Sequence, residues 1–345
     1  MTTPRWVPVA MVAVTAMGLA ACASSEAGEA AGTSQPSEPT ELNLVAFAVP
    51  KAANNAIQAA WGETDDGAGV TWVETYGASG DQSRAVAAGL SADYVHFSLE
   101  GDVTRLVDEG LIDESWNDGP TGGIVSSSVV VLAVREGNPK GIEDWDDLIE
   151  DGIGIVTPNP GSSGSAQWNL LSAWGHGLEQ GGDEQARTFT SALARNIVSL
   201  PGSGRDATTA FLAGTGDVLL TYENEVILAR QNGEPLDYVV PDVTLRIDNP
   251  GAVLIDADPK AQLWLDYVLS AEAQGEFAKL GFRPVVDGVE IGEVEGAHDP
   301  ADPFPTPSVV QTIDDFGGWG AAGPEFFDPE TGVITQILQE SSNAS

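Results

Sequence analysis

The sequence predicts an α/β protein with two lobes, because strand-like and helix-like segments alternate along most of its length. Short apolar runs with β-branched and aromatic residues indicate strands at 42–49, 70–76 and 92–99. Helical patterns lie between or after them, at 81–90 and 101–112. Strands that alternate with helices indicate βαβ units, so each lobe is expected to hold a mostly parallel sheet flanked by helices.

The alternation continues in the second half of the chain, where helical segments again separate the strand-like runs. These runs lie at 126–135 (SSSVVVLAVR), 152–157 (GIGIVT), 196–200 (NIVSL) and 217–222 (DVLLTY). The first of them is long and follows a glycine- and proline-rich stretch, NDGPTGG, where the chain is expected to enter a second lobe.

A second extended stretch, YVVPDVTLRIDNPGAVLI at 238–255, is expected to carry the chain back to the first lobe. Two extended crossings between two α/β lobes make a clamshell. The sequence therefore predicts that 42–127 and 243–345 form lobe 1 and that 128–242 form lobe 2.

The first residues have the pattern of a secretory signal. Arg5 precedes an apolar run that is too short for a membrane span, so we interpret residues 1–21 as a signal peptide. The tetrapeptide LAAC, which ends at Cys22, resembles the lipobox of bacterial lipoproteins, in which the cysteine is lipidated. The alternative is a signal cleaved nearby that leaves one idle thiol. We expect Cys22 to anchor the protein on the outer face of the cell membrane.

Residues 22–41 are rich in Ser, Gly, Glu and Pro and, up to position 40, contain no large apolar side chain. Such a segment cannot bury enough surface to order itself, so it is interpreted as a flexible tether. Across the whole chain, 52 Asp and Glu outnumber 14 Lys and Arg, and the formal net charge is −38. Nucleic acid is excluded as a partner because its phosphates require a basic surface.

Three segments share one design, in which a strand is followed by a Ser/Gly turn and a helix. They are YGASGDQSRAV at 76–86, TPNPGSSGSAQW at 157–168 and LPGSGRDATTAF at 200–211. The first turn of a helix has unpaired N–H groups and a partial positive charge, so three such turns meeting in one place would surround a small anion with donors. The alternative is that these residues are ordinary helix caps.

The sequence gives less support to a dinucleotide site, a serine hydrolase or a zinc site than to an anion site. The segment GSGRDA at 202–207 matches a dinucleotide fingerprint but lies deep in the chain, and neither GSSGS nor GASGD completes a serine-hydrolase elbow. His96 lies in an apolar strand and is expected to be a buried, hydrogen-bonded residue, and His176 and His298 have no zinc-site spacing. We expect no cofactor, no metal and no enzymatic activity, with an extracytoplasmic enzyme using Ser163 as the alternative.

Five blocks resemble, in this order, the sulfate-binding proteins of bacterial ABC importers. They are YGASGDQSRAVAAGLSADYVHFSL, VREGNPKGIEDWDDL, IVTPNPGSSGSAQWNLLSAWG, GSGRDATTAFLAGTGDVLLTYENEVILA and VVQTIDDFGGW. The resemblance implies a type II periplasmic-binding-protein fold, which agrees with the clamshell. It also implies a monomer that captures sulfate outside the cytoplasm and delivers it to an ABC permease in the membrane. Thiosulfate, molybdate and tungstate are the alternative ligands.

The resemblance also implies which residues hold the ion, all of them through uncharged donors. Tyr222 occupies the position of a tryptophan whose indole N–H donates in the family, so its donor role is an expectation specific to this chain. The full expected set consists of backbone amides at Ala48, Ser79, Gly164, Ser165 and Ala207, the hydroxyl of Ser163, and Tyr222. Sulfate offers only acceptors near neutral pH, so neutral donors suffice, whereas phosphate retains a proton that needs an acceptor.

Overall fold

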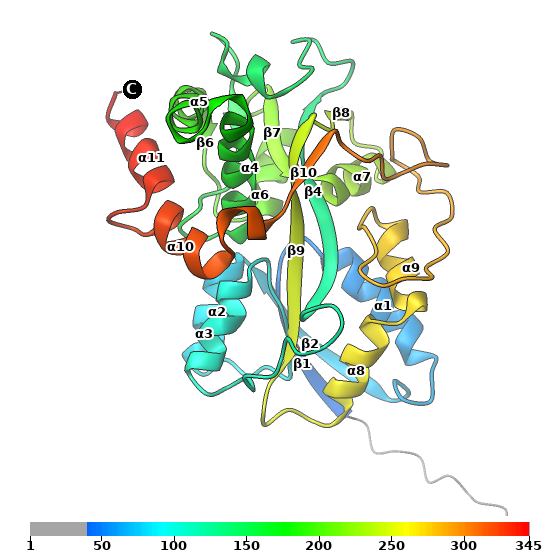
Figure 1. Ribbon diagram of the computed structural model, residues 1–345. Helices are drawn as coiled ribbons and strands as arrows, with labels where there is room; N and C mark the ends of the chain where they lie inside the picture. Colours follow the sequence, from blue (N-terminus) through cyan, green and yellow to red (C-terminus); the bar gives the residue numbers. More distant parts are fainter. Residues whose placement is uncertain (1–39, 345) are drawn as a thin grey trace, which may run out of the picture. The chain divides into compact units, whose positions relative to one another are not determined.

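The computed structural model describes residues 40–344 (Figure 1). The predicted signal peptide, Cys22 and nearly all of the predicted tether lie outside the described residues. The chain forms a curled, mixed α/β fold in which a ladder of paired strands follows the order β2-β1-β3-β9-β4-β7-β5-β6. The predicted fold class is confirmed, and the order of strands divides this ladder into two halves joined at β9 and β4.

The first half of the ladder has a parallel core of three strands. β1 (Thr40–Phe47) pairs in parallel with β2 (Val70–Gly77) on one side and β3 (Tyr94–His96) on the other. β9 (Val243–Val253) then adds to β3 in the antiparallel direction. The predicted strands at 42–49, 70–76 and 92–99 are therefore confirmed, although the third is shorter because the chain turns at the buried residue Ser98.

The second half has the same plan. β5 (Ile155–Val156) pairs in parallel with β6 (Ile197–Ser199) and with β7 (Val218–Tyr222). β4 (Ile124–Arg135) and β8 (Leu236–Val239) complete this half in the antiparallel direction. Each half thus has the parallel strands that the alternation of strands and helices predicts. The antiparallel neighbours β9, β4 and β8 were not predicted by it.

Helices flank both halves of the ladder (Figure 1). Near the first half, α2 packs on α3 and β1, while α1, α8 and α9 pack together. Near the second half, α4 packs on α5, and α6 and α7 contact β7. The helices are α1 (Lys51–Gly62), α2 (Ser79–Ala87), α3 (Glu100–Asp108), α4 (Gly164–Gly181), α5 (Asp183–Arg195), α6 (Gly204–Leu212), α7 (Glu223–Gln231), α8 (Lys260–Val268), α9 (Ala271–Lys279), α10 (Trp319–Phe327) and α11 (Val333–Ala344), with 3-10 turns at Trp145–Ile149 and Ile313–Phe316.

β4 and β9 are the two long strands at the predicted crossings, and they lie side by side (Figure 1). The first part of β4 pairs with β9, and its second part, from Val130 to Val134, pairs with β7. The two strands therefore connect the two halves of the ladder. The limits of the predicted lobes stay predictions, and the end of the chain has contacts with the second half. There α11 packs against α5, and Ser341 Oγ donates to the carbonyl of Ala194.

Aromatic side chains fill much of the core. In the first half Trp61, Trp72 and Trp264 pack edge to face or tilted, with ring centroids 4.8 to 5.9 Å apart. Near the second half Trp168 packs edge to face on Trp319 at 4.7 Å. Such rings bury large apolar areas and fix the relative positions of the helices that carry them. Among the described helices none is long and apolar enough to cross a membrane.

Candidate functional site

Four helices begin directly after strands or turns that carry the predicted site residues. The first residues of α2, α4 and α6 are Ser79, Gly164 and Gly204, and α7 begins directly after Tyr222. The first turns of these helices have backbone N–H groups without helical acceptors. The sequence predicted three such turns, and the structure adds a fourth at Tyr222.

Close contacts bring these helix starts together with the loop after β1. The N–H of Gly80 in α2 donates to the carbonyl of Ser162, just before α4, at 3.2 Å. A Cβ on Gly204 in α6 would lie 3.0 Å from Ser165 Oγ and 3.2 Å from Val49. The starts of α2, α4 and α6 and the loop after β1 are therefore neighbours in space, although they span more than 150 positions of sequence.

The hydroxyl of Ser163 is not used to cap its helix. Ser163 is the N-cap of α4 and is 2% exposed, yet its side chain makes no capping hydrogen bond. In contrast Ser203, the N-cap of α6, accepts the N–H of Asp206 at 3.1 Å. The interpretation as an ordinary cap thus fits Ser203 but does not account for Ser163.

The hydroxyl of Ser79 is committed to other partners. It donates to Asp102 Oδ2 at 2.6 Å and accepts the N–H of Ser98 at 2.9 Å. Asp102 is itself paired with Arg105 at 2.9 Å. Ser79 can therefore serve an anion only through its backbone amide, which is the role that the sequence analysis gave it.

The amide of Ala207 is also committed, which affects one predicted contact. Ala207 N–H donates to the carbonyl of Ser203 at 3.0 Å, the ordinary bond of the fourth residue in a helix. Gly204 and Arg205 are the first two residues of α6, so their amides have no acceptor within the helix. The helix geometry therefore favours Gly204, which faces Ser165, over Ala207 as the donor from this turn.

Ala48 lies in the loop after β1 and is partly buried. The carbonyl of the next residue, Val49, accepts from Arg205 Nη2 at 3.2 Å. The same guanidinium pairs with Glu225 at 2.6 Å. Arg205 thus holds the loop of Ala48 against the start of α6 while its charge is matched by a buried carboxylate.

Tyr222 is fully buried at the end of β7, and its phenol oxygen lies 2.8 Å from Ser98 Oγ. Burial raises the pKa of Tyr222 above its ordinary value, and hydrogen bonds to Ser98, Ser165 and Asn249 offset part of that rise. The phenol therefore keeps its proton at neutral pH and can donate a hydrogen bond. The structure places Tyr222 beside Ser165, another of the predicted site residues.

His96 lies in the core next to this region and confirms the prediction of a hydrogen-bonded core residue. Its Nδ1 is 3.2 Å from Asn54 Oδ1 and its Nε2 is 3.0 Å from Ser126 Oγ. Burial lowers the pKa of His96 to about 3, so the ring is neutral at physiological pH. Within residues 40–344 no three His, Asp or Glu side chains are grouped in a way that would hold a metal ion.

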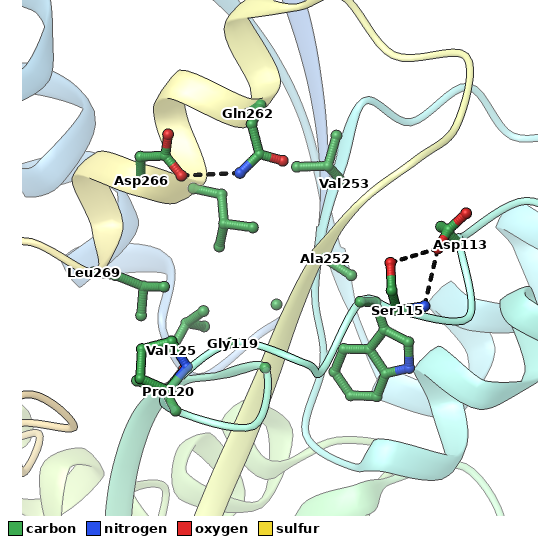
Figure 2. A pocket seen from close by; sticks show the side chains of 15 residues that line it. Asp113, Ser115, Gly119, Pro120, Val125, Ala252, Val253, Gln262, Asp266 and Leu269 are labelled. Carbon is green, nitrogen blue, oxygen red and sulfur yellow. Dashed lines mark hydrogen bonds between the residues drawn. The ribbon is translucent and has the colours of Figure 1, made fainter.

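A surface cavity of about 380 Å³ lies elsewhere, between β9, α8 and the segment before β4 (Figure 2). Asp113 and Asp266 stand on different walls of it, and Gln262 donates to Asp266 at 2.9 Å. None of the predicted site residues lines this cavity. Its carboxylates would repel an anion, so the helix starts remain the better candidate for an anion site.

The fold, with its four buried helix starts, is that of a solute-binding protein, and the sequence matches the bacterial extracellular solute-binding protein family over residues 42–283. The chain belongs to this family. Within it, the chain is similar to the sulfate-binding protein of Synechococcus elongatus, with 42% identity over 92% of this chain and 91% of that protein. A thiosulfate-binding protein of Pseudomonas aeruginosa is 34% identical over 82% of this chain and 86% of that protein.

A solved structure supports the same relationship. The sulfate-binding protein SubI from Mycobacterium tuberculosis has a TM-score of 0.78 and 43% sequence identity, and the match covers 84% of this chain and all of that one. The periplasmic binding protein AfuA from Actinobacillus pleuropneumoniae, at 18% identity and a TM-score of 0.65, shares the fold. The predicted type II periplasmic-binding-protein fold and the predicted family are thereby confirmed.

Sequence reasoning did not single out Ser98, Gly204 and Asn249, which the structure places beside Tyr222 or Ser165. Ser98 lies at the end of a predicted strand, where nothing distinguishes it from a core residue. Asn249 lies in the middle of β9 and donates to the carbonyl of Ser98 at 3.1 Å. The signal for Gly204 was present, since counting from the Ser203 cap gives the amides that lack helical acceptors.

Proposed function

We propose that this protein captures sulfate outside the cytoplasm and delivers it to the permease of an ABC importer. The observation that carries the proposal is the packing of four helix starts around buried, uncharged hydrogen-bonding groups. Neighbouring carboxylates are paired, Asp102 with Arg105 and Glu225 with Arg205, so they do not act as free acceptors. The sulfate-binding proteins of Synechococcus elongatus and Mycobacterium tuberculosis, which this chain matches over most or all of their length, support sulfate as the ligand.

The proposed ligand contacts keep the predicted set with one change. The hydroxyl of Ser163 and the phenol of Tyr222 donate from side chains, and the remaining contacts are backbone amides. In this proposal Gly204 takes the place of Ala207, for the reason given by the helix geometry. The amide contacts are Ala48, Ser79, Gly164, Ser165 and Gly204. Each bond to a charged group is worth about 1.5 to 3 kcal/mol, so neutral donors are sufficient for strong binding.

The acidic composition of the chain is compatible with this role. Surface charges are screened beyond about 8 Å at physiological salt, whereas the donors act at hydrogen-bonding distance. The negative surface is expected to slow the approach of a dianion more than it weakens the bound state.

The position of the histidines favours binding over hydrolysis. A serine nucleophile needs a base within hydrogen-bonding distance. In the described chain His96 bonds Asn54 and Ser126, and the other two histidines bond Asp146 and the carbonyl of Tyr238. We therefore propose that Ser163 is a ligand donor and that the protein has no catalytic activity.

The proposal also includes a monomeric protein held on the outer face of the cell membrane by lipidated Cys22. That part rests on the tetrapeptide LAAC and on membership of the family of bacterial extracellular solute-binding proteins. A receptor anchored in this way would stay close to its permease, which raises its effective concentration at the membrane.

Calorimetry on ligand-stripped protein with sulfate, thiosulfate, molybdate and phosphate tests the ligand. Sulfate is expected to bind most tightly, and phosphate at least tenfold more weakly near pH 7, because the site offers donors and no free acceptor. Phosphate within tenfold of sulfate would contradict the donor-only account. Tighter binding of thiosulfate would reassign the ligand within the same class. Turnover of a panel of esters would support the enzyme alternative.

A further inference from the structure

Ser98 uses each of its polar groups to join different parts of the chain. It is fully buried in the short segment between β3 and α3. Its N–H donates to Ser79 Oγ at 2.9 Å, and its carbonyl accepts from Trp168 Nε1 at 2.8 Å and from Asn249 Nδ2 at 3.1 Å. Its hydroxyl pairs with Tyr222 at 2.8 Å.

These partners fall on the two sides of the predicted division between the lobes. Ser79 and Asn249 belong to the segments assigned to lobe 1, as Ser98 does. Trp168 and Tyr222 belong to the segment assigned to lobe 2. Separation of the lobes would break the bonds to Trp168 and Tyr222 and would leave the other two in place.

The helix start at Gly164 is also fitted to Ser98. A Cβ on Gly164 would lie 2.7 Å from both Cβ and Oγ of Ser98, closer than atoms can approach without movement. The absence of a side chain at this position therefore lets the backbone of α4 approach the end of β3 closely. Gly164 is one of the proposed amide donors, so Ser98 lies next to the ligand contacts.

The paired hydroxyls of Ser98 and Tyr222 leave one proton to donate elsewhere. Each hydroxyl has one O–H, and the bond between them uses one of the two. The other O–H has Ser165 and Asn249 as its neighbours in the structure, since the Tyr222 phenol also bonds these two residues, so a ligand would compete with them for this proton. An anion that offers only acceptors would favour the orientation in which this O–H faces it.

We propose that Ser98 is a positioning residue for ligand binding, which joins Trp168 and Tyr222 to the first lobe when the lobes close and orients the Tyr222 hydroxyl. This inference rests on the proposed function. It assigns to Ser98 a role in retaining the ligand, because the bonds that it makes between the lobes must break before the ligand leaves.

A double-mutant cycle on the full chain tests this role with sulfate as the probe. The variants are Ser98→Ala, Tyr222→Phe and the double change, with Kd from calorimetry and the dissociation rate from a chase of radiolabelled sulfate. Ser98→Ala is expected to raise Kd about tenfold, mainly through faster dissociation, with the association rate changed less than about twofold. The double variant is expected to bind sulfate about as weakly as whichever single variant binds it less tightly, because the two hydroxyls act as a pair.

Ser172→Ala is the matched control. Ser172 is also fully buried, in α4, and its hydroxyl has no hydrogen-bond partner in the structure. Its removal is expected to leave the dissociation rate unchanged. The proposal would be overturned if Ser98→Ala changed the dissociation rate no more than Ser172→Ala does. It would also be overturned if the fold-changes in Kd of Ser98→Ala and Tyr222→Phe simply multiplied in the double variant.

Failure of the proposed function would look different. Wild-type protein that takes up no sulfate would contradict the proposed ligand, whatever the variants do. In that case the same cycle, read in the thermal midpoints of the ligand-free protein, decides the role of Ser98. If the fall in midpoint of the double variant is smaller than the sum of the two single falls, Ser98 and Tyr222 act as a pair and the positioning role stands. If the two falls simply add, the role is overturned.

Discussion

Arg205 and Glu225 form a charge pair at 2.6 Å in which the carboxylate is 1% exposed and the guanidinium 37% exposed. Thr208 also donates to this carboxylate at 3.1 Å, and Arg205 reaches the carbonyl of Val49 at 3.2 Å. The pair thus fixes the starts of α6 and α7 and the loop of Ala48. Its removal is expected to affect both stability and the ligand site.

Arg205→Ala should destabilise the folded protein by about 3 kcal/mol, because it leaves the buried carboxylate of Glu225 without its partner. Chemical denaturation measures the change. Lys279→Ala, which breaks the exposed pair with Glu276, is the control and should cost less than about 1 kcal/mol. Adding Glu225→Gln to Arg205→Ala should recover part of the loss. If Arg205→Ala and the control lowered the free energy of unfolding equally, the buried pair would contribute no more to stability than an exposed one.

Ser163→Ala should weaken sulfate binding by about 1 to 3 kcal/mol, the value of one hydrogen bond to an ion. The free energy of unfolding should change little, because the Ser163 hydroxyl makes no capping bond. Calorimetry and denaturation together measure the two effects. Ser203→Ala is the contrasting variant, since that hydroxyl does cap α6 and its loss should cost about 1 kcal/mol of stability. Unchanged sulfate affinity in Ser163→Ala would remove Ser163 from the site.

Tyr222→Phe should lower sulfate affinity by about 1 to 2 kcal/mol, because it keeps the ring and deletes one donor. The melting temperature of the ligand-free protein should fall by only a few degrees, the cost of the lost bond to Ser98. Tyr222→Trp should retain binding if the larger ring fits, since the indole N–H donates. If wild type and Tyr222→Phe bind sulfate equally, the tyrosine only packs against the site and another group must supply the contact.

His96 should make the protein less stable in mild acid. Its pKa is about 3 when folded and 6.5 in the unfolded reference, so between these values the unfolded chain binds the extra proton. Stability is therefore lost as the pH falls below 6.5. Between pH 7 and pH 5 the free energy of unfolding of the wild type should fall by about 2 kcal/mol more than that of His96→Gln, whose side chain cannot titrate. Parallel stability curves for the two proteins over this range would rule out a buried, neutral histidine.

Cys22→Ser should remove the proposed acylation site. The variant is expected either to keep its signal or to be released into the medium, whereas the wild type should fractionate with membranes until detergent is added. Metabolic labelling with a fatty acid provides the direct readout. Wild-type protein found free of the membrane without detergent would contradict the lipid anchor.

The sequence by itself determined the fold class and the positions of most elements. Alternating apolar runs and helical periods are local properties, so the strands at 42–49, 70–76 and 217–222 and the helix after Ser163 could be predicted from neighbouring residues alone. The Ser/Gly turns were visible for the same reason, because capping and turn chemistry depend on a few adjacent residues.

Only the tertiary structure decided which groups meet and which donors are already used. Ser98 and Tyr222 are separated by 124 positions, and no local pattern indicates that their hydroxyls lie 2.8 Å apart. The commitment of Ser79 to Asp102 and of Arg205 to Glu225 likewise depends on helices brought together by folding. Hydrogen bonds have short range and definite direction, so a donor's availability is known only after its neighbours are placed.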